Sequence, residues 1–397
     1  MNINDHCHNR SKRILILHRE GNFFNNPSLK CIIDLLREKG YGIDLRYRKS
    51  PSPMPRIDGI RFLPFGRVIG LIKAVLTDLL CAWPLVVLSV FIEKFFVYGK
   101  YDLLIGVDRH GLIEASIFSK LTKTPYVFIS FEILFEDETS CAFKSLERRA
   151  SKDVSLWIVQ DEVRAKQLQS ENLLPSSIRS LLPLSSAGPG LPNNERLRDH
   201  LGIPKEKKIA IAAGSVFAWS MITQILGSVV EWPDDWVLIV HERYGRTKEL
   251  LTTDANAARA LIGSKIYISD AAAEAVDDMG SIFSGVSAGL AFYKPNFNNP
   301  GTGKNLEFLG MAAGKISTYL RYGVPVIMNE IGLYADEARR EQFGRVVDSP
   351  ADISAVLNDI DREAYRKNAR RYFDEQLDFN IYKKNLWTRL LFTMRNN

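Results

Sequence analysis

Short apolar runs alternate with amphipathic segments at the start of the chain. Residues 13–19 form an apolar run, residues 28–40 place apolar side chains at helical spacing, and residues 41–48 alternate apolar and polar side chains. The first and third patterns are typical of strands. Ser28 before the helical pattern and Gly40 after it are start and stop signals of a helix. Strand, helix and strand in this order predict a βαβ unit with parallel strands and a right-handed crossover.

The same alternation continues and resumes after one break. Further strands are expected at 101–108, 125–132 and 154–161, with helices at 110–123, 140–153 and 162–173. Between residues 175 and 204 Pro, Ser, Gly and Asn prevail, which is typical of an interdomain linker. A second series of strands is expected at 207–215, 236–243, 264–270 and 288–293, followed by helices at 351–360 and 362–395. We therefore predict an α/β protein of two Rossmann-like domains, over residues 1–185 and 186–375.

Composition narrows the class of protein. The 397 residues suffice for two domains, and 46% apolar and 25% charged residues are ordinary for a globular chain. The net charge of +6 favours anionic partners such as nucleotides or an anionic membrane surface. No basic block carries interleaved aromatic residues, so no nucleic-acid partner is expected.

The cysteines indicate a reducing compartment without structural zinc. Four cysteines lie far apart, and none forms a CxxC pair. His6, Cys7 and His8 could bind a metal, but at a terminus this is the weaker interpretation. No signal peptide is found, because the first apolar run is too short. We therefore expect a cytoplasmic protein.

Residues 69–99 form a strongly apolar stretch. Its part uninterrupted by charge, residues 79–92, is shorter than the roughly 20 residues that a membrane-spanning helix needs. We expect one or two buried helices, broken near Pro84. The alternative is a face that docks on an anionic membrane. Basic residues flank the stretch: Arg61, Arg67, Lys94 and Lys100.

Two loops of the first half follow predicted strands, where ligands bind in parallel sheets. Glu20, Gly21 and Asn22 follow the first strand, and the glycine would let the backbone approach an acceptor. The alternative is a plain turn. Asp108 and His110 follow the strand at 101–108, between glycines that we interpret as flexible. They are candidates for general base and acceptor binding, unless Asp108 merely caps a helix.

Anion-binding groups gather in the second half. Gly214 and Ser215 end the strand at 207–215, and Arg243, with Arg246, follows the strand at 236–243. Downstream, glycines, lysines and hydroxyls precede or open a helix, whose first turn favours an anion. These are Gly303, Lys304, Gly314, Lys315, Ser317 and Thr318. The pattern predicts a diphosphate site without a P-loop, and no carboxylate pair suggests a metal.

The segment KISTYLRYGVPVI, residues 315–327, resembles the K-[LI]-x-E-Y-[LM]-A-x-G-x-P-V-I signature of glycosyltransferases with the GT-B fold. Residues 157–185, 201–215 and 343–360 resemble other segments of that family in the same order. The tail, residues 376–397, resembles its closing helix, which crosses back onto the first domain. Many such enzymes carry two glutamates with seven residues between them. Here Gly310 and Thr318 occupy their positions, so the contact to the donor ribose is altered.

The resemblance implies that the second domain binds a nucleotide-sugar, UDP- or GDP-linked, and the first binds the acceptor across a cleft. It implies a metal-independent transferase of the hexosyl class without a cofactor. We expect a glycan or lipid-linked acceptor in cell-surface polysaccharide synthesis, and attachment to the inner face of the plasma membrane through residues 69–99. Two hypotheses stay open: a nucleotide-sugar 2-epimerase of the same fold, and a catalytically silent binding module.

Overall fold

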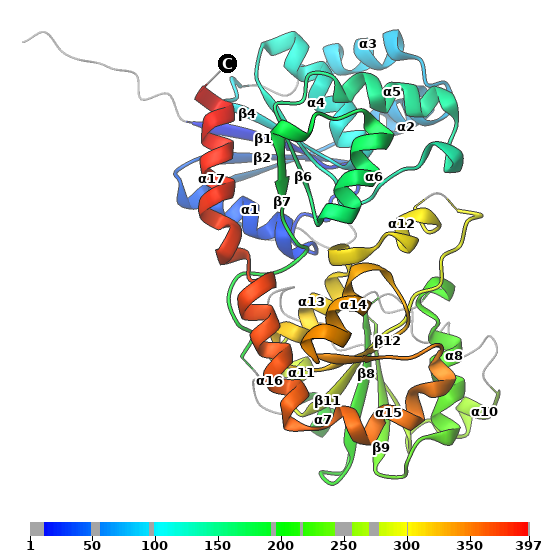
Figure 1. The fold of residues 1–397 in the computed structure, drawn as a ribbon. Helices are drawn as coiled ribbons and strands as arrows, with labels where there is room; N and C mark the ends of the chain where they lie inside the picture. Colours follow the sequence, from blue (N-terminus) through cyan, green and yellow to red (C-terminus); the bar gives the residue numbers. More distant parts are fainter. Residues whose placement is uncertain are drawn as a thin grey trace, which may run out of the picture.

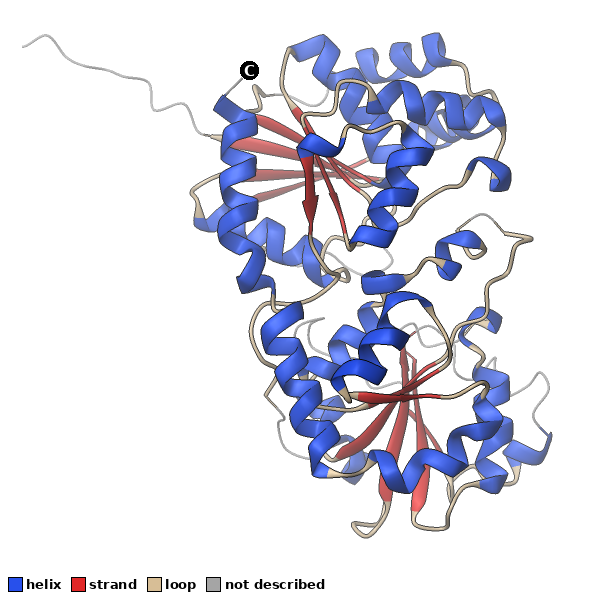
Figure 2. Cartoon of the chain, in the orientation of Figure 1, coloured by secondary structure: helices blue, strands red, loops and turns tan. Residues whose placement is uncertain are grey.

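The structure is a computed structural model, and it describes residues 12–48, 56–94, 99–191, 196–214, 217–242, 256–269, 278–299 and 301–395. Two α/β domains follow one another along the chain (Figure 1), and each is built on a parallel sheet with helices on both faces (Figure 2). The predicted fold class is therefore confirmed.

The first domain contains a seven-stranded parallel sheet in the order β3-β2-β1-β4-β5-β6-β7. Its strands are β1 (Arg13–Leu17), β2 (Gly42–Tyr47), β3 (Ile60–Pro64), β4 (Leu103–Val107), β5 (Tyr126–Ile129), β6 (Leu156–Val159) and β7 (Arg179–Leu181). The sequence did not predict the two edge strands. β3 is largely exposed and lacks a clear apolar pattern, and β7 has three residues inside the expected linker.

Helices cover both faces of this sheet. They are α1 (Pro27–Glu38), α2 (Arg67–Ala74), α3 (Trp83–Lys94), α4 (Asp108–Thr122), α5 (Cys141–Ser151) and α6 (Glu162–Asn172). Successive side chains of a strand point to opposite faces. Leu15 and Leu17 therefore pack with α4 and α5, whereas Ile14 and Ile16 pack with α1. The nearly continuous apolar runs in the sequence follow from burial on both faces.

The second domain contains a six-stranded parallel sheet in the order β10-β9-β8-β11-β12-β13. Its strands are β8 (Lys208–Gly214), β9 (Trp236–Glu242), β10 (Ile266–Ser269), β11 (Val286–Ala291), β12 (Val326–Met328) and β13 (Gly344–Val346). Its helices are α7 (Arg196–His200), α8 (Ile222–Ser228), α10 (Asn256–Arg259), α11 (Gly280–Phe283), α12 (Lys304–Glu307), α13 (Gly314–Arg321), α14 (Gly332–Glu341), α15 (Ile353–Ile360) and α16 (Glu363–Tyr372).

The last helix, α17 (Phe379–Arg395), returns to the first domain and lies beside α1 in Figure 1. Phe379, Leu386 and Leu390 are buried in the core that contains β1 and α1. The Phe379 amide donates to the Ser186 carbonyl over 3.1 Å, which fixes the crossing point. The expected return of the C-terminal helix is confirmed. Its sequence pattern was predicted as one helix, but a π turn at Phe373–Leu377 and an extended Asp378 separate α16 from α17.

The N-cap of helix α1 lies two residues earlier than its sequence suggested. Asn26, not Ser28, caps it: the Asn26 side chain accepts from the Leu29 amide over 3.0 Å. The buried Ser28 hydroxyl instead bonds the Pro183 carbonyl at 2.9 Å and accepts from the Ser185 amide at 2.8 Å. Ser28 therefore attaches α1 to the chain that leads into the second domain.

The apolar stretch at 69–99 forms two helices with a break just before Pro84, as expected, but these helices are not buried. A π turn, η1 (Val75–Leu79), connects α2 to the break. Eleven large apolar side chains on this segment are exposed: Val68, Ile69, Leu71, Ile72, Val75, Leu79, Leu80, Leu85, Leu88, Phe91 and Ile92. We name this surface the apolar face. Among the described residues, no helix is long and apolar enough to cross a bilayer.

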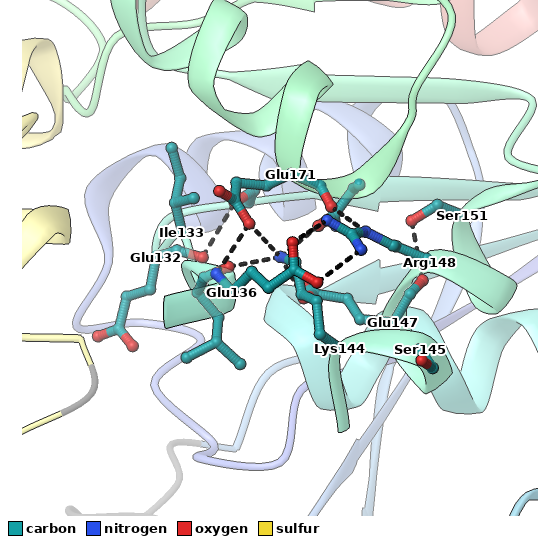
Figure 3. A network of polar contacts seen from close by, with 12 residues as sticks. Glu132, Ile133, Glu136, Lys144, Ser145, Glu147, Arg148, Ser151 and Glu171 are labelled. Atoms are coloured by element: carbon teal, nitrogen blue, oxygen red, sulfur yellow. Dashed lines mark hydrogen bonds and ion pairs between the residues drawn. The ribbon is translucent and has the colours of Figure 1, made fainter. Parts of the chain in front are cut away.

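A buried ammonium organises the loop between β5 and α5 (Figure 3). Lys144 is fully buried, and its Nζ contacts Glu147 at 2.9 Å, Asn172 at 2.8 Å, Glu171 at 3.3 Å and the Leu134 carbonyl. The contacts join α5, the end of α6 and the loop that follows β5. The Phe131 and Glu132 amides of this loop donate to the carboxylate of Asp108, at the start of α4.

We predict that Lys144→Met will lower the free energy of unfolding by about 3–5 kcal/mol, because it leaves the buried Glu147 carboxylate without its partner. Lys120→Met is the matched control, since Lys120 pairs with Asp153 at the surface and such pairs contribute less than about 1 kcal/mol. Urea unfolding of both variants measures the difference. Equal losses would contradict the assignment.

Candidate functional site

Each sheet has one point at which the strand order reverses. In the first sheet this point lies between β1 and β4, and in the second it lies between β8 and β11. Ligands of open α/β sheets bind beyond the carboxyl ends of the strands at such points. Most of the predicted site residues follow these four strands, so the candidate site has two centres, one in each domain.

The centre of the second domain is Lys315, the second residue of α13. Its ammonium lies 5.5 Å from the centroid of the Tyr293 ring, beyond the end of β11. Its Cε would lie 3.5 Å from a Cβ on Gly214, the last residue of β8. Within the described part of the chain, no carboxylate pairs with this ammonium. Burial lowers the pKa of Lys315 to about 8, so the group is a cation in need of a counter-ion.

Helix α13 is held in place by Tyr319. Its hydroxyl accepts from the Ala213 amide at 2.9 Å and donates toward the Ile211 and Leu290 carbonyls, each at 3.2 Å. A Cβ on Gly289 would lie 2.4 Å from the Tyr319 ring, so only glycine fits there. One side chain thus bonds β8 and β11 at the switch point, and it sets the start of α13 beside both strands.

The two hydroxyls of α13 have different surroundings. Ser317 is buried, and its hydroxyl bonds the Leu184 carbonyl at 2.6 Å and the Gly314 carbonyl at 3.0 Å. This placement differs from the expected donor contact, because the hydroxyl is used between the domains. Thr318 is half-buried and bonds the Gly314 carbonyl at 2.7 Å. Its oxygen can still accept a hydrogen bond from a hydroxyl of the nucleotide-sugar donor. Its expected role in donor binding stays a prediction.

Lys304 does not join Lys315. It forms an ion pair with Asp137 of the first domain, and its amide donates to Glu138 over 2.6 Å. A Cβ on Gly303 would collide with the same Glu138 carboxylate. Lys304 and Gly303 therefore serve the domain contact in this structure and not the expected anion site. Three other predicted residues lie outside the described residues: Ser215, Arg243 and Arg246.

The first-domain centre contains a charged cluster around His110. His110 Nε2 lies 2.7 Å from Asp78 Oδ1, and Nδ1 lies 3.7 Å from Glu20 Oε1. Arg19 pairs with Asp78 at 2.9 Å. Burial alone would lower the pKa of His110, but the hydrogen bonds to Asp78 and Glu20 raise it. Burial would likewise raise the pKa of Glu20, yet His110 and His18 lower it well below its ordinary range. Asp78 and Glu20 therefore favour the protonated form of the imidazole.

Asp108 has the properties of a proton acceptor. It opens α4 with φ 52°, a strained value for a residue other than glycine. Its carboxylate does not cap its own helix but accepts from the Phe131 and Glu132 amides at 2.7 and 3.0 Å. Burial, with the nearby Glu132 charge, raises the pKa of Asp108 to about 7. A carboxyl group with this pKa can take up a proton near neutrality.

The glycines around Asp108 provide close packing and not the expected flexibility. A Cβ on Gly106 would lie 2.5 Å from the Gly111 carbonyl, and one on Gly111 would lie 2.2 Å from the Leu17 carbonyl. In the other loop, Gly21 adopts φ 71° in the turn after β1. Asn22 Oδ1 is buried and finds no hydrogen-bond donor among the described residues. Its expected contact to an acceptor stays a prediction.

A polar contact joins the two centres. Arg164, fully buried on α6, donates to Asn305 Oδ1 at 3.1 Å, the Phe308 carbonyl at 3.0 Å and the Phe131 carbonyl at 2.9 Å. Asp161 accepts from the Met311 amide at 2.8 Å. The segment 301–312 therefore lies against the first domain immediately before Lys315.

Sequence reasoning missed several of these residues. Asp78 lies in the stretch at 69–99, which we interpreted from its hydropathy alone. Arg164 and Asp161 lie at the start of a helix, where charged residues are common and do not indicate a site. Tyr293 ended a predicted strand. Only the contacts that they make in the folded chain, which depend on strand order and on how the domains meet, reveal them.

Comparison with known proteins supports the two-domain fold described above. Residues 282–388 match the family described as Glucosyltransferase 3-like, C-terminal domain. This match covers the second sheet from β11 onward and most of α17. No curated protein matches the chain in sequence.

Solved structures match nearly the whole chain at low identity. HepE from Anabaena, solved with UDP, is 12% identical at TM-score 0.65, covering 95% of this chain and 99% of its own. WaaG, a glycosyltransferase involved in lipopolysaccharide biosynthesis, is 14% identical at TM-score 0.63, covering 94% and 98%. A glycosyltransferase from Rickettsia africae is 12% identical at TM-score 0.66, covering 98% and 100%. The chain has the GT-B fold. In this GT-B protein, both centres lie close to segment 301–312, through which the second domain contacts the first.

We predict that Gly310→Ala will loosen the domain contact. Gly310 has φ 48°, and a Cβ there would lie 2.2 Å from the Asp161 carboxylate, so the loss should be about 1–3 kcal/mol or more. Gly301→Ala is the control, because Gly301 also has positive φ but its nearest neighbour atom would lie 3.9 Å away. Thermal unfolding and the radius of gyration from solution scattering measure the effect. A Gly310 variant no different from the control would count against this contact.

Proposed function

We propose that the chain is a glycosyltransferase that uses a nucleoside-diphosphate sugar. The observation that carries this proposal is the Lys315 ammonium, which has no carboxylate partner in the described residues and lies at the switch point of the second sheet. HepE, of the same fold, was solved with UDP and with UDP-glucose. A diphosphate supplies the counter-ion that Lys315 lacks.

The proposed reaction is direct substitution at the anomeric carbon of the donor. An acceptor hydroxyl forms the new glycosidic bond, and the bond from the anomeric carbon to the diphosphate oxygen breaks. The nucleoside diphosphate leaves with the electron pair, and Lys315 stabilises its growing charge. The hydroxyl proton passes to the Asp108 carboxylate, whose pKa burial raises to about 7. The His110 cation, held by Asp78 and Glu20, binds the acceptor.

We propose that the reaction needs no metal or other cofactor. In the described part of the chain, no group of three His, Cys, Asp or Glu side chains could hold a metal ion. Lys315 and the amides at the start of α13 supply the positive charge instead. Release of UDP or GDP from a panel of donors, measured with and without EDTA, tests the activity and this point. Loss of turnover in EDTA would overturn the metal-independent proposal.

Binding of UDP should weaken as the pH rises through about 8, because Lys315 loses its proton there in the free protein. Lys315→Met should raise the Kd about 10–100-fold, the loss of one hydrogen bond to a charged group. It should also remove the pH dependence. Lys304→Met is the control, since Lys304 pairs with Asp137 and should leave the Kd unchanged. Titration calorimetry at pH 6.5 and 9 measures all three proteins. A Kd unaffected by Lys315→Met would count against the diphosphate site.

We further propose that the acceptor is lipid-linked, for cell-surface polysaccharide synthesis, and that the apolar face rests on the inner surface of the plasma membrane. Charge favours an anionic lipid surface as the occupant. Of the acidic residues of this segment, Glu93 is buried against Arg46 and Lys73. Asp78 is 44% exposed, but its carboxylate pairs with Arg19 and His110. Lys94, at the end of α3, is exposed. The outer surface is thus apolar with a basic edge.

The membrane proposal predicts that the protein floats with liposomes that contain phosphatidylglycerol, at low salt. Leu79→Glu combined with Leu88→Glu should leave it in the bottom fraction, because both side chains are exposed on the apolar face. Val230→Glu is the control, as Val230 is exposed on the second domain. A wild-type protein that stays in the bottom fraction would exclude membrane docking.

A further inference from the structure

Asp78 belongs to the apolar face and to the His110 centre at the same time. We propose that Asp78 is the positioning residue of His110, and that contact of the apolar face with an anionic lipid surface adjusts His110 through it. This inference rests on the proposed function, since it assigns a regulator to the proposed acceptor centre. The reaction would then be coupled to the surface that carries the acceptor.

The backbone at Asp78 explains how one segment serves both purposes. In η1 the Leu80 amide donates to the Val75 carbonyl over 2.9 Å, five residues back, so one extra residue enters the turn. Thr77 is buried, whereas Val75 and Leu79 are exposed. The inserted residue changes the direction of the side chains that follow. Asp78, itself 44% exposed, reaches His110 from its place between the buried Thr77 and the exposed Leu79. Such π turns occur frequently at functional sites.

The neighbours of His110 make Asp78 its strongest partner. The closest charged groups facing the imidazole are Asp78 at 2.7 Å, Glu20 at 3.7 Å and Arg19, which pairs with Asp78 itself. The Phe143 ring of α5 packs against the imidazole at 5.8 Å between centroids. Asp78 is the one member of this set that does not come from the loop after β1 or from the α4–α5 layer.

Contacts on both sides of Asp78 attach the segment to the first domain. Lys73 of α2 pairs with Glu93 of α3 and with Glu114 of α4, the latter at 3.0 Å. Leu76 in η1 and Cys81 after it pack against the core of the first domain. A shift of η1 against lipid would therefore move Asp78 relative to His110 together with these contacts.

The test follows the ionisation of His110 by histidine ring NMR on the full chain, with the His110→Gln variant assigning the signal. Asp78→Asn should lower the midpoint pH of the His110 titration by about one pH unit or more, because a neighbouring carboxylate is lost. Asp78→Glu should restore part of that shift. Nanodiscs that contain phosphatidylglycerol should move the wild-type midpoint, whereas in Asp78→Asn they should bind without moving it.

An unchanged midpoint in Asp78→Asn would overturn the positioning role. A wild-type midpoint unchanged by bound nanodiscs, or a failure to bind them, would overturn the coupling. The wild-type lipid measurement needs no variant, so the coupling can be judged even if Asp78→Asn does not fold. UDP calorimetry separates the two proposals: absence of UDP binding ends the transferase proposal but leaves the His110 measurements decisive.

Discussion

The buried guanidinium of Arg164 fixes the relation between the two domains. It has no exposed surface, and it bonds carbonyl oxygens on both sides of the domain boundary. A buried charge is tolerated only where its hydrogen bonds are satisfied, so segment 301–312 has little freedom of position. Because Lys315 follows this segment and Asp108 bonds the loop that contains Phe131, one side chain sets the spacing between the two centres.

The two centres are alike in position and in electrostatics. Each lies at a strand-order switch, and each places an ionisable group where burial and charge move its pKa toward neutrality. The pKa of Lys315 falls because no carboxylate compensates for its burial, whereas that of Asp108 rises because the carboxyl is buried and Glu132 adds a like charge. Perturbed groups of this kind concentrate at functional sites. The second domain offers a cation and the first offers a base.

Local signals in the sequence predicted much of the fold. Gly323 after α13 and the apolar run of β12 behave as their residue types suggest: Gly323 adopts φ 67°, and Tyr319 and Leu320 are fully buried. Lys315 was found because a lysine near a helix start is a local feature. Ser317 and Lys304 have the same local signals but serve the domain contact. That difference depends on which segments lie close together in three dimensions, and this cannot be read from a short stretch of sequence.

The prediction that the stretch at 69–99 is buried was wrong for a related reason. The stretch carries enough apolar residues to form a core, but hydropathy does not show which helix faces pack against the rest of the domain. Lys73 and Glu93, which interrupt the apolar stretch in the sequence, are buried together with Val86 and Val90, whereas most of the large apolar residues around them are exposed.

The return of α17 makes the core of the first domain discontinuous in sequence. The core around β1 and α1 includes Leu386 and Leu390, which follow the second domain along the chain. A cut in the chain between the two domains would therefore remove α17 from the first domain and expose the apolar side chains of α1 that it covers. The first domain is thus completed by residues from both sides of the second.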